Sequence, residues 1–93
     1  MQKFEYCMMT LTVEGGRLLH TLSGRLTFLT PAGNKAHPIL RDKKMGDDNV
    51  WHAAFRIIAN MGNDGWEMIG MDSTSTPNDS EHTKTYWFKR PKS

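Results

Sequence analysis

The residues best suited to binding chemistry are basic side chains gathered in one segment. Residues 17–44 hold six Lys or Arg against one acid, whereas the rest of the chain holds six against nine acids. Arginine presents a planar fork that matches phosphate or carboxylate, and histidine gains charge below about pH 6.5. Such a block predicts an anion-binding surface. The alternative is a solvated segment whose lysines only maintain solubility. The predicted ligand-binding residues are Arg17, Arg25, Lys35, His37 and Arg41.

Patterns for catalysis or metal binding do not occur in the sequence. Cys7 lies within an apolar run, which predicts an inert buried thiol rather than a nucleophile. The four histidines are scattered, without the paired spacing of a zinc site. Gly15 and Gly16 lack the Lys-Ser/Thr sequel of a phosphate-binding loop. We therefore expect a protein that is not an enzyme, with no catalytic residue, metal site or cofactor.

The length and composition predict one globular domain over residues 1–93. The chain is 38% hydrophobic and 24% charged, with one cysteine and a net charge of +2. No apolar run approaches the roughly 18 residues of a membrane span, and no secretion signal is recognisable. A single cysteine cannot form an internal disulfide. These features predict a cytoplasmic location without a membrane partner.

Turn signals and apolar periodicity predict the strands and loops that position the basic residues. Glycine pairs and Pro31 predict breaks between short strands, and a polar stretch over 31–47 predicts a long loop. The basic insert, residues 14–47, is thus expected as a hairpin plus a loop. In the first strand, Phe4, Tyr6 and Met8 should face one side and Cys7 the other. The predicted strands cover residues 3–13, 17–22, 25–30, 66–73 and 83–90.

One amphipathic helix is predicted over residues 48–61. The acids at its start suit the positive end of the helix dipole, and Gly62 is placed as a left-handed C-cap. Trp66 is expected to pack against the helix near Phe55 and Ile58. Glu67 is expected to pair with Lys89 or Arg90 across the strands. The predicted apolar stripe consists of Trp51, Ala54, Phe55, Ile58 and Met61.

The predicted fold class is α+β. An antiparallel sheet of about five strands, in the order βββ-α-ββ, would carry the helix on one face. A single helix can cover only one face of such a sheet. Apolar residues remain for the other face, so we expect a homo-oligomer or a fold-back of the insert over that face.

Three short blocks carry a resemblance to a known family. The blocks are Phe4-Glu5-Tyr6, then Gly62 to Glu67 reading GNDGWE, and Phe88-Lys89-Arg90-Pro91. Their order resembles a family of small bacterial and phage proteins that is classed as a domain of unknown function. The resemblance implies a small α+β fold and no particular activity. This chain departs from the family pattern in residues 14–47. The implied location is the cytoplasm of a bacterium, or of the host cell if the protein is phage-encoded.

The function that these observations favour is non-enzymatic binding by a small oligomer. The leading hypothesis is a protein-binding accessory or inhibitor module. The alternative is a phage-type sponge that sequesters a small phosphorylated ligand, such as a signalling nucleotide, through the basic insert. A further alternative is a single-stranded nucleic-acid binder with Tyr86 and Trp87 as stacking residues, which is disfavoured because acids share the same sheet.

Overall fold

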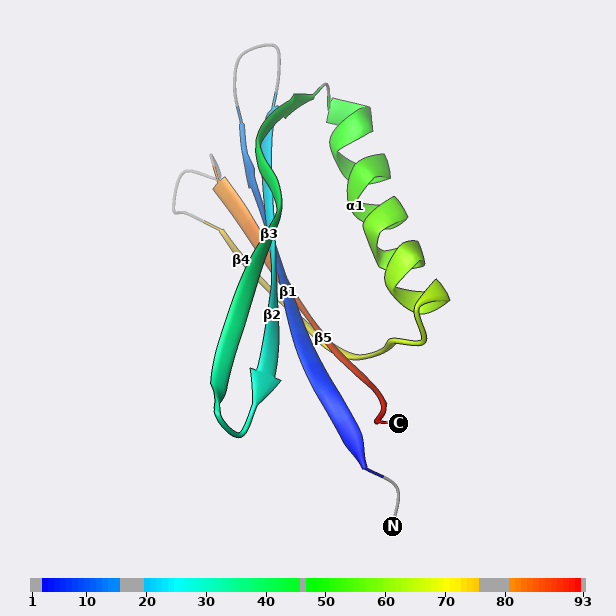
Figure 1. The fold of residues 1–93 in the computed structure, drawn as a ribbon. Coiled ribbons are helices and arrows are strands. Elements are labelled where there is room, and N and C mark those ends of the chain that lie inside the picture. The colour runs from blue at the N-terminus through cyan, green and yellow to red at the C-terminus, as the bar shows by residue number, and fades with distance from the viewer. Residues whose placement is uncertain (1–2, 16–19, 46, 76–80, 93) are drawn as a thin grey trace.

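A computed structural model of the chain describes residues 3–15, 20–45, 47–75 and 81–92, with the backbone alone for residues 41, 42, 45 and 47–51. These segments form five strands and one helix (Figure 1). The elements are β1 (Phe4–Glu14), β2 (His20–Thr30), β3 (Gly33–Met45), α1 (Asp47–Asn63), β4 (Glu67–Ser75) and β5 (Glu81–Pro91).

The five strands form one antiparallel sheet, and α1 packs against one of its faces (Figure 1). The strand order is β3-β2-β1-β5-β4, so β1 is central and β3 and β4 are the edges. The predicted α+β class and the order βββ-α-ββ are confirmed. In the described part of the chain, no helix combines the length and apolar character needed to cross a membrane.

The segments that supply the second and third strands differ from the prediction. The two short strands expected at 17–22 and 25–30 are wrong, because β2 runs unbroken from His20 to Thr30. The loop expected over 31–47 is also wrong, because residues 33–45 form β3. Only the turn at Pro31 and Ala32 lies between these strands, and Gly33 adopts a positive φ of 132° beside it. Residues 20–45 of the basic insert therefore form a two-stranded part of the sheet.

The polar composition of β3 is explained by its place at the sheet edge. Pro38 pairs with Arg25 and donates no backbone hydrogen bond, which is tolerated where one side of a strand is unpaired. Lys35, Lys43 and Lys44 are exposed along the same strand. Charged side chains and proline on an edge strand discourage edge-to-edge aggregation. A segment that lacks apolar alternation can therefore still form a strand when it lies at the edge of the sheet.

The predicted turn at Ser23 and Gly24 is instead a tightly packed point inside β2. The pairing of β2 with β3 shifts in register on either side of Gly24. A Cβ atom added at Gly24 would lie 2.8 Å from Cδ2 of Leu11, a core residue. The glycine is present because a neighbouring strand occupies the space that a side chain would need.

Gly24→Ala is expected to lower the free energy of unfolding by about 1–3 kcal/mol, since Leu11 must leave its packed position. Urea denaturation measures the change. Gly62→Ala is the matched control, because Gly62 lies in α1 with no atom within 4 Å of an added Cβ. The control should gain up to about 1 kcal/mol from helix propensity. Equal stability of Gly24→Ala and the wild-type protein would contradict this account of the glycine.

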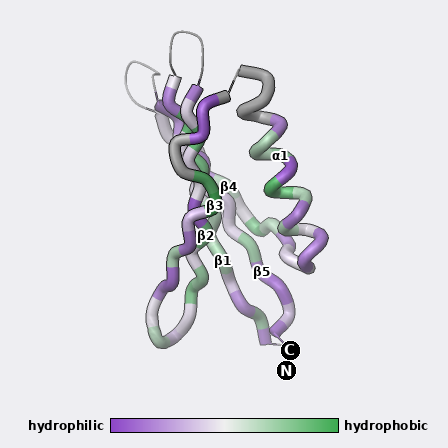
Figure 2. The backbone as a smooth tube through the Cα atoms, turned by 45° about the horizontal axis from the view of Figure 1, so that its top comes forward, coloured by the Kyte–Doolittle hydropathy of each residue, from purple (hydrophilic) through white to green (hydrophobic). Residues whose placement is uncertain are grey.

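The core lies between α1 and the sheet. Hydropathy alternates along the strands (Figure 2), and the odd-numbered positions of β1 face the helix. Phe88, Met9, Leu22 and Cys7 are the largest fully buried side chains. Among the side chains that the structure describes, the buried apolar set is Cys7, Met9, Leu11, Val13, Leu22, Ala54, Met61, Trp66, Tyr86 and Phe88.

The helix is longer than predicted, and the face that it buries against the sheet is not the predicted one. Ala54 and Met61 are buried with Ile57 and Ile58 packed beside them, whereas Phe55 is 60% exposed. At 100° per residue, Phe55 lies about a quarter turn from the direction of Ala54, so its place in the predicted stripe is wrong. The expected C-cap at Gly62 is also wrong. The helix continues to Asn63, and the positive φ of 89° belongs to Gly65.

Candidate functional site on the open face of the sheet

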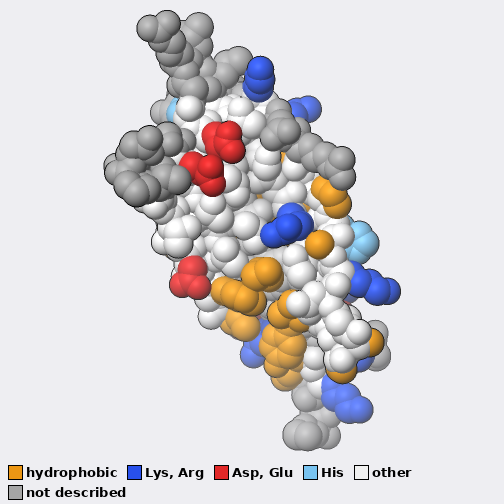
Figure 3. Space-filling view, turned by 90° about the vertical axis from the view of Figure 1, so that its left-hand side faces the viewer, with side chains coloured by type: hydrophobic (Ala, Val, Ile, Leu, Met, Phe, Trp, Pro, Cys, Tyr) orange, Lys and Arg blue, Asp and Glu red, His pale blue; other side chains and the backbone are white. Residues whose placement is uncertain are grey.

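The face of the sheet opposite α1 is the candidate site. Even-numbered residues of β1 point to this side, as predicted for Phe4, Tyr6 and Met8. The register adds odd-numbered residues of β2 and β5 to the same side, including Leu29 and Trp87. We call this surface the open face. Figure 3 views it directly.

Apolar side chains gather on the lower part of the open face (Figure 3). Tyr6 pairs with Leu29, and Met8 pairs with Trp87. These four residues, the apolar cluster, are contiguous because Tyr6 and Met8 are two positions apart on one strand. Tyr6 is 44% exposed and the other three are half-buried. Trp87 borders Gly70, where an added Cβ would lie 3.7 Å from its ring.

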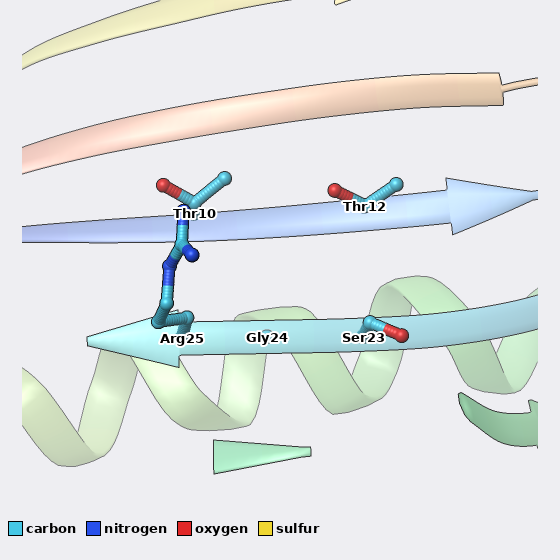
Figure 4. Close-up of a pocket in the computed structure, with 5 residues that line it drawn as sticks. All are labelled: Thr10, Thr12, Ser23, Gly24 and Arg25. Carbon is cyan, nitrogen blue, oxygen red and sulfur yellow. The ribbon is translucent and has the colours of Figure 1, made fainter. Parts of the chain in front are cut away.

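Hydroxyl groups and one arginine occupy the region next to the apolar cluster. Thr10, Thr12, Ser23 and Arg25 line a shallow hollow of about 250 Å³, with the Arg25 side chain lying across toward β1 (Figure 4). The hydroxyls of Thr12 and Thr83 are 3.3 Å apart. The open face is thus apolar at one end and hydroxyl-rich beyond it.

The predicted ligand-binding residues do not gather on one face where the structure describes them. Arg25 lies on the open face, opposite Thr10. Lys35 and His37 pair with Phe28 and Leu26, whose side chains point to the helix side. The His37 ring contacts the Phe28 ring edge-on at 5.6 Å. Arg17 lies outside the described residues, as does the side chain of Arg41.

A further hollow of about 250 Å³ opens beside the apolar cluster. Phe4, Tyr6, Leu29 and Pro31 contribute to its lining. The Lys89 ammonium lies 4.7 Å from the centre of the Phe4 ring, so a charge borders the aromatic wall. A hollow with aromatic walls can receive an apolar side chain from a partner.

Cys7 has no role at the open face. The thiol is fully buried on the helix side of β1. Burial raises the pKa of the Cys7 thiol to about 11, and the nearby Arg90 offsets part of that rise. A thiol with so high a pKa is a poor nucleophile near neutral pH. Among the residues that the structure describes, no group of three His, Cys, Asp or Glu side chains could hold a metal ion.

The three blocks behind the family resemblance meet at one end of the sheet, on the helix side. The Arg90 guanidinium lies 4.2 Å from the centre of the Trp66 ring and forms an ion pair with Glu5. It also donates a hydrogen bond of 3.2 Å to the Asp64 carbonyl oxygen. We call these four residues the Arg90 clamp. Glu67, expected to pair with Lys89 or Arg90, lies opposite Lys89 in the register of β4 and β5, which agrees with the first of these two alternatives. The clamp joins both terminal strands to the turn after α1, which is a structural role.

The assembly of the open face does not follow from the sequence alone. Alternation puts Tyr6 and Met8 on one side of their strand, whereas only the strand pairing adds Leu29 and Trp87 to that side. Tyr86, which the disfavoured nucleic-acid alternative would need as an exposed stacking residue beside Trp87, is buried in the core. The alternation of the last strand separates these two aromatics onto opposite faces. That alternation is the one sequence signal that could have separated them.

Comparison with known proteins supports the fold and assigns no function to the open face. No family model and no curated protein matches the chain. Among solved structures, the chain is similar to a conserved kinetoplastid-specific protein from Trypanosoma cruzi, with a TM-score of 0.52 and 13% sequence identity. The similarity covers 90% of this chain and 95% of that chain. At this identity the likeness concerns the fold alone.

Proposed function

We propose that this protein is a non-enzymatic protein-binding module whose partner docks on the open face of the sheet. The observation that carries the proposal is the apolar cluster of Tyr6, Met8, Leu29 and Trp87, which α1 leaves uncovered. Contiguous apolar surface on a small domain is typical of an interaction site. Aromatic residues and methionine are the side chains enriched in protein interfaces.

The surroundings of the apolar cluster support docking of a protein. The aromatic-walled hollow beside it offers a place for an anchoring side chain. Hydroxyls and the exposed Arg25 supply a polar border on one side. An apolar centre with a polar rim is the common anatomy of protein interfaces.

A small anionic ligand is the second candidate function. Arg25 lies beside the hydroxyls of Thr10, Thr12 and Ser23 in the hollow of Figure 4, and such groups can bind phosphate or carboxylate oxygens. Among the predicted ligand-binding side chains that the structure describes, Arg25 alone lies in this hollow, because Lys35 and His37 lie on the other side of the sheet. This candidate therefore has weaker support than docking of a protein.

Photo-crosslinking in the source cells tests the proposed function. A benzophenone amino acid in place of Tyr6 should form protein adducts, because this side chain belongs to the apolar cluster and is the most exposed of its four members. The same amino acid in place of Phe55, an exposed aromatic position on the helix, is the matched control. Adducts from position 55 alone, or from neither position, would contradict docking at the open face.

A further inference from the structure

We propose that the partner on the open face is a second copy of this chain, packed sheet against sheet about a two-fold axis that runs parallel to the strands between β1 and β5. The inference rests on the proposed function, since it names the occupant of the same surface. The position of the axis follows from the rows across the sheet. A row is the set of residues that lie opposite one another on neighbouring strands. Such an axis places β1 of one copy against β5 of the other, and β2 against β4.

One row across the sheet is self-complementary in charge. Arg25 pairs with Thr10, Thr10 with Thr85, and Thr85 with Asp72, which places these residues on β2, β1, β5 and β4 in turn. Arg25 and Asp72 are therefore equally far from the line between β1 and β5, on opposite sides of it. Both side chains are exposed. The two-fold axis sets Arg25 of each copy opposite Asp72 of the other, which makes two ion pairs.

The neighbouring row supplies an apolar centre under the same symmetry. Met8 pairs with Thr27 on one side and Trp87 on the other, and Trp87 pairs with Gly70. The axis places Met8 of each copy against Trp87 of the other. Thr27 faces Gly70, where the missing side chain leaves room. The ion pairs flank this centre, as charges at a partly solvated rim normally do.

The next row adds a contact between an aromatic ring and a cation. Tyr6 pairs with Lys89, so the axis places Tyr6 of one copy over Lys89 of the second copy. Lys89 already lies over an aromatic ring in its own chain, that of Phe4. A lysine between two rings gains from both when the interface excludes water.

The orientation of the axis is decided by charge. An axis across the strands through the Arg25 row would set Arg25 against Arg25 and Asp72 against Asp72. Like charges held together at an interface strongly oppose association. The axis along the strands replaces both repulsions with attractions. Two sheets packed about 10 Å apart leave a gap that the long arginine side chain can cross.

The size of the surface fits a reversible dimer. Four strands about 4.8 Å apart and a paired length of about nine residues cover roughly 600 Å² per copy. The two copies together reach about 1,200 Å², the lower limit for specific interfaces. Two rows carry unfavourable contacts. In the Tyr6 row the axis sets Leu29 of one copy against the Glu67 carboxylate of the other. In another row Glu14 pairs with Glu81, and the axis brings these acids from both copies together in mutual repulsion. Removing that repulsion should strengthen the dimer.

Sedimentation velocity over a micromolar concentration range tests the dimer, with charge reversal as the probe. Arg25→Asp and Asp72→Arg should each weaken dimerisation about tenfold or more, because each turns two attractions into repulsions. Arg25→Asp combined with Asp72→Arg in one chain should restore it. An equimolar mixture of the two single variants should form a heterodimer. Glu14→Gln should tighten the wild-type dimer severalfold.

Arg56→Asp, a charge reversal on the exposed side of α1, is the matched control and should leave the dimer unchanged. Thermal unfolding of each variant confirms that it is folded. A monomer at all concentrations, or failure of the combined variant and of the mixture to recover association, overturns the two-fold dimer. If the protein is a monomer and position 6 crosslinks to a different protein, the dimer fails while the proposed function stands. If the protein is a monomer and position 6 forms no adduct, both fail.

Discussion

Phe88→Ala is expected to lower the free energy of unfolding by about 3–5 kcal/mol. Phe88 is 2% exposed and lies on β5 directly opposite Cys7 of the central strand. Removing its ring loses buried apolar contacts and leaves a cavity among the core residues. Domains of this size have total stabilities near 5–15 kcal/mol, so the variant should be marginally folded at 25 °C. Urea denaturation followed by circular dichroism measures the change.

Phe88→Leu is the control for this prediction. Leucine keeps most of the apolar volume, so its cost should stay near 1 kcal/mol. A similar loss for both variants would show that the aromatic shape matters more than the volume. A loss below about 1 kcal/mol for Phe88→Ala would contradict the central position of this ring in the core.

Trp66→Ala is expected to cost a comparable 3–5 kcal/mol. Trp66 is 7% exposed, lies 6.1 Å from the Phe28 ring and carries the Arg90 guanidinium on its face. Its loss removes buried area and also separates the end of α1 from the sheet. Equilibrium unfolding in urea measures the effect, with Trp66→Phe as the variant that keeps an aromatic face.

A double-mutant cycle separates the energy of the contact between Arg90 and Trp66 from the energy of burying Trp66. Trp66→Ala and Arg90→Ala should be non-additive by about 0.5–2 kcal/mol, because the two side chains stack directly. Additive losses would mean that Arg90 acts through Glu5 and Asp64 alone. Neither variant alters a side chain of the open face, so effects on partner binding should follow stability alone.

The open face and the core should respond in opposite ways to substitution. Tyr6 is 44% exposed and contributes little to the packed interior, whereas Phe88 belongs to it. The proposed function therefore requires variants at Tyr6 to lose association while the domain stays folded. Variants at Phe88 should lose stability first. This contrast separates a docking surface from a structural one.

Local sequence determined much of this protein. Caps and apolar periodicity located the helix to within two residues at its C-terminal end. Alternation in β1 predicted that Tyr6 and Met8 face away from Cys7, and this is confirmed. Composition predicted the buried thiol. These features depend on residues within a few positions of each other, and the backbone preferences involved act over that range.

The tertiary structure decided how the segments are paired. Ser23 and Gly24 have the composition of a turn, but Gly24 lies mid-strand because Leu11 packs against it from β1. Residues 33–45 lack apolar alternation and form a strand because an edge position requires only backbone pairing.

Register between distant strands also decided which side chains share a face. Pairing put Arg25 in one row with Asp72, 47 positions along the chain, and placed Lys35 and His37 on the other side of the sheet. A shift of one residue would move every side chain of a strand to the opposite face. Because register is set by long-range contacts, the basic segment could be found in the sequence, while the surface that it helps to form could be found only in the fold.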